Sequence, residues 1–155
     1  MIVLDTSALI GAFNAHYLPD SIKGFWAFLD TEWRAGNVVV PRSVYEELRD
    51  GSGGAFAWVR ERRPFVAEPS HDVQRLAGGL LTRFRFKQGR DRADPFVIAE
   101  ASVRGFGVAT YEGMSPTGTV ARAKASVDNM PDICRVLRIE CFQPARAWRH
   151  VGLAL

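Results

Sequence analysis

Short apolar runs recur along the chain, and polar or turn-forming residues bound each of them. Most are three or four residues long and rich in Val or Ile, which is too short for a helix and predicts buried strands. A strand that is apolar on both faces is typical of a parallel sheet covered by helices on both sides. The predicted strands cover residues 2–4, 38–40, 108–111 and 139–142.

Between these strands, apolar residues recur at spacings of three and four, which indicates amphipathic helices. Ser or Asp before such a segment, and Pro in its first turn, are typical helix-start signals. Ser21, Ser43, Ser70 and Asp94 are therefore predicted N-caps, and residues 14–20 are predicted to form a polar turn. The predicted helices are one that starts at residue 8, followed by residues 22–35, 44–49, 55–63, 71–84, 95–104, 131–137 and 145–150.

Strands alternate with helices from one end of the chain to the other. This order predicts an α/β protein, a three-layer α/β/α sandwich with a mainly parallel central sheet. The chain has 155 residues, without an internal repeat or a long linker, so we expect residues 1–155 to form a single domain. Residues 113–128 lack an apolar period and predict a long loop, which in a compact domain is usually functional or disordered.

The composition is that of a soluble globular protein, with 47% apolar and 24% charged residues. No apolar run approaches the ~20 residues needed to span a bilayer. No basic segment precedes the first apolar run, so we expect no signal peptide. Cys134 and Cys141 are predicted to be reduced core residues, because no further Cys or His lies at zinc-ligand spacing. Together these features predict a cytoplasmic protein without a membrane anchor.

The formal net charge is +3, and the densest basic segment lies in the second half of the chain. Such a segment is most often a solvated face, but beside an acidic metal site it would suit a polyanionic substrate. Asp91 is the only acidic residue within it. The basic residues of this segment are Arg83, Arg85, Lys87, Arg90 and Arg92.

Asp5, Asp94 and Glu112 each lie at the carboxyl end of a predicted strand or at the start of a predicted helix. In a parallel sheet such positions meet at one rim, where α/β folds bind ligands. Glu46 and Glu47 lie on a helix that starts from the same rim. Carboxylates within ~4 Å repel each other by a few kcal/mol at an effective dielectric of about 20, unless a cation neutralises them. Oxygen ligands without Cys or His favour Mg²⁺ or Mn²⁺.

A simpler interpretation is that these acids are unrelated. Asp5 is followed by Thr6 and Ser7, and all three residue types cap helices well. Asp94 precedes Pro95, which is also a helix-start pattern. On this interpretation the acids stabilise helix ends and bind no metal.

Four segments together resemble the PIN domains, metal-dependent ribonucleases that include the toxins of VapBC-type toxin–antitoxin pairs. Their order and separations match that family from end to end. Residues 130–141 are similar to one PIN-like subgroup of prokaryotic proteins. The resemblance implies a PIN-like fold and RNA as the substrate. The four segments are residues 2–7, 41–48, 93–99 and 109–112.

The resemblance also implies roles for single residues. Asp5, Asp94 and Glu112 would bind one or two Mg²⁺ or Mn²⁺ ions. Glu47 would orient water or complete the metal shell, and Glu46 is the alternative; Glu47 is preferred because it directly precedes an apolar residue. A metal-activated water would then attack an RNA phosphodiester in line. The residues implied to contact substrate are Ser7, Lys87, Arg90 and Arg92.

The chain departs from the family at Glu112, where PIN domains usually have Asp two residues after the threonine. The longer side chain could shift or weaken the second metal position. Asp132 could compensate if the loop before it folds back over the rim, or it could simply cap the helix that follows Pro131. His16, His71 and His150 are scattered and are assigned no catalytic role.

The resemblance implies a Mg²⁺- or Mn²⁺-dependent endoribonuclease, with a small antitoxin as a candidate partner and a homodimer as a candidate assembly. The main alternative is a PIN-like scaffold that binds RNA or a protein without cutting. A phosphatase of the haloacid-dehalogenase type would need a second Asp at position 7, where this chain has Ser7. A Rossmann cofactor domain would need a glycine-rich turn after the first strand, which is absent.

Overall fold

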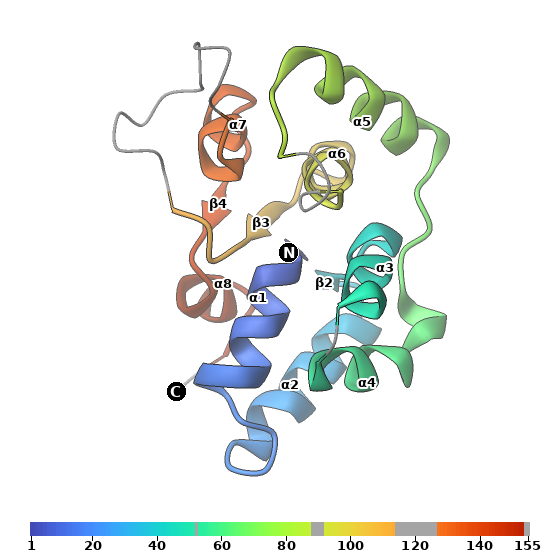
Figure 1. Ribbon diagram of the computed structural model, residues 1–155. Coiled ribbons are helices and arrows are strands. Elements are labelled where there is room, and N and C mark those ends of the chain that lie inside the picture. The colour runs from blue at the N-terminus through green and yellow to red at the C-terminus, as the bar shows by residue number, and fades with distance from the viewer. Residues whose placement is uncertain (52, 88–91, 114–126, 154–155) are drawn as a thin grey trace.

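The computed structural model describes residues 1–51, 53–87, 92–113 and 127–153. Its centre is a sheet of four parallel strands in the order β2-β1-β3-β4 (Figure 1). The register places Leu4 beside Ala109 on the two central strands. This confirms the predicted parallel sheet. The strands are β1 (Ile2–Leu4), β2 (Val38–Val39), β3 (Gly107–Ala109) and β4 (Cys141–Phe142).

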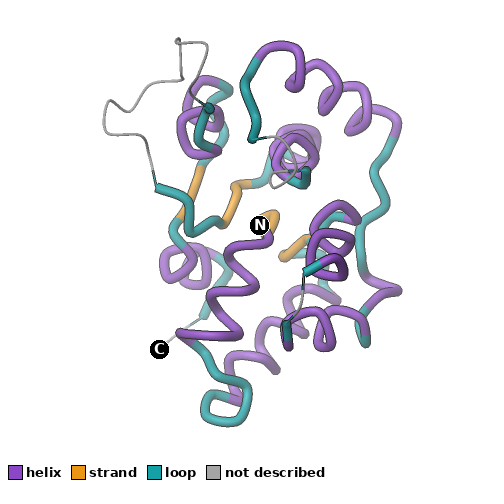
Figure 2. The backbone as a smooth tube through the Cα atoms, viewed as in Figure 1, coloured by secondary structure: helices purple, strands orange, loops and turns teal. Residues whose placement is uncertain are grey.

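Helices enclose this short sheet (Figure 2). Helix α6 contacts β1 and β3, and α7 contacts β4; Figure 1 shows both helices on one side of the sheet. On the other side, α2 contacts β2 and α8 contacts β3 and β4, which confirms the predicted α/β/α layers. The helices are α1 (Thr6–Gly11), α2 (Lys23–Arg34), α3 (Arg42–Asp50), α4 (Gly54–Arg60), α5 (His71–Arg83), α6 (Asp94–Arg104), α7 (Met130–Val136) and α8 (Pro144–His150).

Strand β1 is buried along its whole length, and it leads directly to the candidate site. Ile2, Val3 and Leu4 are fully buried, because β1 has a strand on each side and helices over both faces. At about 25 cal/mol per Å² of buried apolar area, each such side chain stabilises the fold by about 1.5–3 kcal/mol. The strand therefore gives a rigid support to the residue that follows it.

Several predicted helix starts are wrong. Ser21 does not cap α2; its N–H bonds to Leu18 O in a turn, and the helix begins at Lys23. Ser43 lies inside α3, which begins one residue after Pro41. Ser70 does cap α5, with its hydroxyl 3.3 Å from Val73 N.

Two further predictions change at helix ends. Asp94 is the first residue of α6 and not its N-cap, because the carbonyl of Ala93 accepts the first helical bonds, from Phe96 N and Val97 N. The predicted turn at residues 14–20 starts later, because a π-helical segment, Ala12–His16, continues α1. A 3-10 turn, Arg63–Phe65, follows α4.

None of the helices in the described residues is long and apolar enough to cross a bilayer. The predicted loop at residues 113–128 lies almost entirely outside the described residues. That residues 1–155 form one domain stays a prediction.

Candidate active site

Asp5 lies where β1 ends and α1 begins, at the carboxyl rim of the sheet. It is only 6% exposed. Its Oδ2 atom accepts hydrogen bonds from Thr110 Oγ1 at 2.8 Å, Ser7 Oγ at 2.5 Å and Ser7 N at 3.3 Å. Thr110 reaches Asp5 because β1 and β3 are paired neighbours and both residues follow their strands directly. Two hydroxyls therefore fix the orientation of this carboxylate.

Burial and hydrogen bonding shift the pKa of Asp5 in opposite directions. Burial raises the pKa of the carboxyl above its ordinary value, because the charged form is removed from water. The hydrogen bonds from Ser7 and Thr110 lower the pKa but do not compensate fully. A charged Asp5 is thus costly to the isolated protein, and a bound cation would offset that cost.

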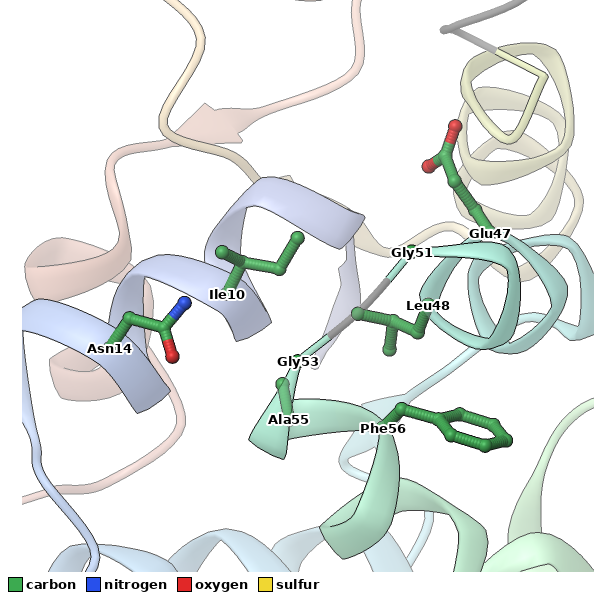
Figure 3. A pocket seen from close by; sticks show the side chains of 8 residues that line it. All are labelled: Ile10, Asn14, Glu47, Leu48, Gly51, Gly53, Ala55 and Phe56. Carbon is green, nitrogen blue, oxygen red and sulfur yellow. The ribbon is translucent and has the colours of Figure 1, made fainter.

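The two candidate glutamates on α3 have different neighbours. Glu47 accepts a hydrogen bond from Thr6 Oγ1, which places it beside the junction of β1 and α1. Glu46 instead forms an ion pair with Arg42, 2.9 Å from its Nε. Figure 3 shows Glu47 at one edge of a small pocket that Leu48 and Phe56 also line, with its carboxylate turned away from these two side chains. Glu47 therefore contacts the residue that follows Asp5 and Glu46 does not, while the assignment of the catalytic role to Glu47 stays a prediction.

Asp94 and Glu112 both act electrostatically on one buried residue, Cys134. Asp94 is 8% exposed at the start of α6, and Glu112 is half-buried just after β3. The negative charges of both raise the pKa of the buried Cys134 thiol on α7, although the hydrogen bond to Cys141 and burial are the larger causes. The same hydrogen bond lowers the pKa of Cys141. The acids and the two cysteines therefore share one region of the protein.

Glu112 also has a structural partner. Its Oε2 accepts a hydrogen bond from Met130 N at 2.6 Å, at the first residue of α7, and its own N–H donates to Thr110 Oγ1 at 3.0 Å. Asp132 is fully buried in the first turn of α7, with Oδ1 3.8 Å from Arg135 Nη2. An Asp at position 112 would have a shorter reach toward α7.

The acids fit a hard divalent cation by their chemistry, because carboxylate and hydroxyl oxygens suit Mg²⁺ and Mn²⁺. As the side chains lie, however, no three His, Cys, Asp or Glu side chains in the described ranges form a group that could hold a metal. Binding would therefore require side-chain rotations at the rim. For Glu112 such a rotation would break its hydrogen bond from Met130 N.

The predicted substrate-binding residues have different positions. Arg92 is exposed and forms an ion pair with Asp50, 2.8 Å from its Oδ2. Arg92 lines one pocket together with both candidate glutamates, Glu46 and Glu47. Lys87 is exposed at the end of a described segment, and Arg90 lies outside the described residues.

Ser7 has a role inside the site. Its hydroxyl donates to Asp5 Oδ2 and accepts from Tyr111 N at 3.0 Å. It therefore connects the end of β3 to the residue that ends β1. The contact with a substrate phosphate stays a prediction.

Comparison with known proteins gives a family and a fold. Residues 2–155 match a family model described as "Domain of unknown function (DUF4411)". The chain belongs to the DUF4411 family. A search of curated proteins found no match.

Two solved structures resemble this DUF4411 protein over nearly their whole length. One is the crystal structure of FitAcB from Neisseria gonorrhoeae, with a TM-score of 0.54, 17% identity, and coverage of 94% of this chain and 99% of the other. The second is FitAB bound to an IR36 DNA fragment, with a TM-score of 0.50, 17% identity, and coverage of 100% and 99%. The DUF4411 protein thus has a PIN-like fold, as predicted.

Sequence reasoning missed the supporting residues of the site. Thr6 holds Glu47, and Thr110 holds Asp5. Thr110 lies in one of the segments that resemble PIN domains, but only the pairing of β1 with β3 puts its hydroxyl on Asp5. The sequence also gave no sign that the candidate acids act electrostatically on Cys134 and Cys141.

Proposed function

We propose that this protein is a Mg²⁺- or Mn²⁺-dependent endoribonuclease that hydrolyses RNA phosphodiester bonds. The observation that carries the proposal is the buried Asp5 carboxylate, held by Ser7 and Thr110 at the carboxyl rim of a PIN-like sheet. A buried, charged and precisely oriented carboxylate costs stability, and such groups are concentrated at functional sites. Asp94 and Glu47 at the same rim supply further carboxylates.

In this proposal Asp5, Asp94 and Glu112 hold the metal. The metal, when bound, supplies Lewis-acid activation of water and neutralises charge on the phosphate. Thr110 and Ser7 keep Asp5 in one orientation.

The remaining roles fall to residues around the metal position. Glu47 orients the attacking water, and Thr6 keeps Glu47 in place. Arg92, Lys87 and Arg90 attract the RNA backbone, and they contribute affinity more than sequence choice.

The direct test is cleavage of RNA by the purified protein with Mg²⁺, with Mn²⁺ and with EDTA. Asp5→Asn and Asp94→Asn keep the side-chain size and remove the charge. We expect metal-dependent cleavage by the unchanged protein and its loss in both variants. Asp72→Asn is the matched control, because Asp72 is exposed on α5 and forms its ion pair with Arg75 of the same helix.

A catalytically inactive PIN-like scaffold is the second candidate, and the Glu112 contact favours it. Glu112 is engaged with Met130 N, and the described acids do not converge into a three-ligand group. A scaffold would bind RNA or a protein partner without cutting. In that case the unchanged protein and Asp94→Asn would show the same absence of cleavage while RNA binding persists.

We also propose a protein partner that covers the acidic rim, as an antitoxin would. A basic side chain inserted among Asp5, Asp94 and Glu112 would offset their charges. FitAB, one of the structural neighbours, was solved bound to a DNA fragment. Co-purification with the product of the neighbouring gene tests the partner, and the mass of the purified protein in solution tests a homodimer. If no second protein co-purifies, the partner is excluded. If the mass in solution is that of a monomer, the homodimer is excluded.

A further inference from the structure

Cys134 and Cys141 meet across a tight reversal of the chain. Cys134 lies in α7 and is fully buried, whereas Cys141 opens β4 and is half-buried. Between them, Ile139 N donates to Cys134 O at 2.8 Å, and Arg138 adopts the left-handed conformation with φ 59°. The reversal packs α7 against β4, and the two thiols lie near enough for each to shift the pKa of the other.

We propose that Cys134 and Cys141 form an oxidative modification site, at which a peroxide converts the two thiols into an intramolecular disulfide. A disulfide requires the two Cβ atoms to be close and to face each other. Cys134 and Cys141 lie on two elements that pack against each other across a tight reversal, which comes near to this requirement without a change in fold. The site is separate from the predicted roles of the acids and does not rest on the proposed function.

The exposure of the two residues sets the order of events. Peroxide reaches the half-buried Cys141 first. The sulfur of Cys141 attacks one peroxide oxygen and the O–O bond breaks, which gives a sulfenic acid at Cys141 and one water. The sulfur of Cys134 then attacks the sulfur of that sulfenic acid. The S–O bond breaks, the proton of Cys134 joins the departing hydroxide as a second water, and the S–S bond remains. Peroxide is reduced by two electrons, and the thiol pair is oxidised by two.

The location makes such a bond relevant to the acidic rim. Cys134 is on the helix whose first N–H is held by Glu112, and both Asp5 and Glu112 act electrostatically on Cys141. A disulfide would fasten α7 to β4 beside these acids.

The test treats the native, full-length protein with hydrogen peroxide, removes the peroxide, unfolds the protein and alkylates the remaining thiols before mass spectrometry. We expect a chain lighter by two hydrogen atoms with no alkylated cysteine, and recovery of both thiols after reduction. Cys134→Ser should instead accumulate a sulfenic acid at Cys141 that a dione probe traps. Cys141→Ser should leave Cys134 reduced, because it is buried.

Three results would overturn the inference. The first is full alkylation of both cysteines after peroxide. The second is over-oxidation of Cys141 while Cys134 stays a thiol, since the second step would then have failed. The third is a disulfide between two chains. The measurement on the unchanged protein decides the question even if a variant fails to fold.

Discussion

The hydroxyl of Thr110 lies 2.8 Å from Oδ2 of Asp5, although the two residues are 105 positions apart in the chain. The contact exists because β1 and β3 are neighbours in the sheet and end at the same rim. The same hydroxyl accepts a hydrogen bond from Glu112 N. Thr110 therefore connects two of the candidate metal ligands.

Replacing Thr110 by Val should weaken both the fold and the proposed activity. The shape of the side chain is kept, but Asp5 loses a buried donor and Glu112 N loses its acceptor. Leaving such groups unsatisfied costs about 1–3 kcal/mol each. We expect a lower free energy of unfolding in urea and at least a severalfold slower cleavage of RNA. Thr110→Ser keeps the hydroxyl and should recover most of both; equal losses in the two variants would contradict this role.

Asp5→Asn should stabilise the metal-free protein near neutral pH. Burial raises the pKa of Asp5 in the folded state above its value in the unfolded chain, so the folded state binds the proton more tightly. The stability associated with this group is full below about pH 4, the ordinary range for Asp, and is lost as the pH rises through the folded pKa.

The measurement is the unfolding free energy of both proteins in EDTA as a function of pH. At pH 7 the unfolding free energy of Asp5→Asn should be higher than that of the unchanged protein. In acid the unfolding free energies of the two proteins should become equal. Adding Mg²⁺ at pH 7 should stabilise only the unchanged protein, because a ligand that binds the folded state shifts the equilibrium toward it. A constant difference at all pH values would exclude ionisation of Asp5 as the cause.

Glu47→Gln and Glu46→Gln form a matched pair of variants on one helix. Each removes one negative charge, but Glu47 contacts Thr6 and Glu46 contacts Arg42. A residue that orients water contributes about 10²–10⁴-fold to rate, whereas a partly exposed ion pair contributes about 0–1 kcal/mol to stability. We expect Glu47→Gln to lose at least about 10²-fold in cleavage rate and Glu46→Gln to stay close to the unchanged protein. The reverse pattern would assign the role to Glu46.

Two variants of Glu112 should distinguish its structural role at the start of α7 from a role in metal binding. Glu112→Asp shortens the side chain that accepts from Met130 N, and loss of such a helix-end contact costs about 0.5–2 kcal/mol. Glu112→Gln keeps the length and an acceptor oxygen but removes the charge. We expect Glu112→Asp to have a lower melting temperature than the unchanged protein. Glu112→Gln should melt nearly as the unchanged protein does but lose Mg²⁺-dependent activity. If both variants melt as the unchanged protein does, Glu112 does not stabilise α7.

The sequence determined the class of fold and the position of Asp5 at the end of the first strand. The apolar run of residues 2–4 is buried as predicted, and the alternation of strands and helices does form a parallel sheet. These features depend on local periodicity, which is visible in a short window of sequence. Asp5 lies at a strand end for the same local reason.

Only the tertiary structure decided which side chains support the acids. Thr6 meets Glu47 across 41 positions, and Ser7 and Thr110 meet across 103, because separate elements pack at one rim. Helix starts at Ser21 and Ser43 were wrong for a related reason: capping residues are common, and neighbouring backbone bonds decide which of them opens a helix. Contacts between distant segments depend on strand order and packing, and no local pattern of residues carries that information.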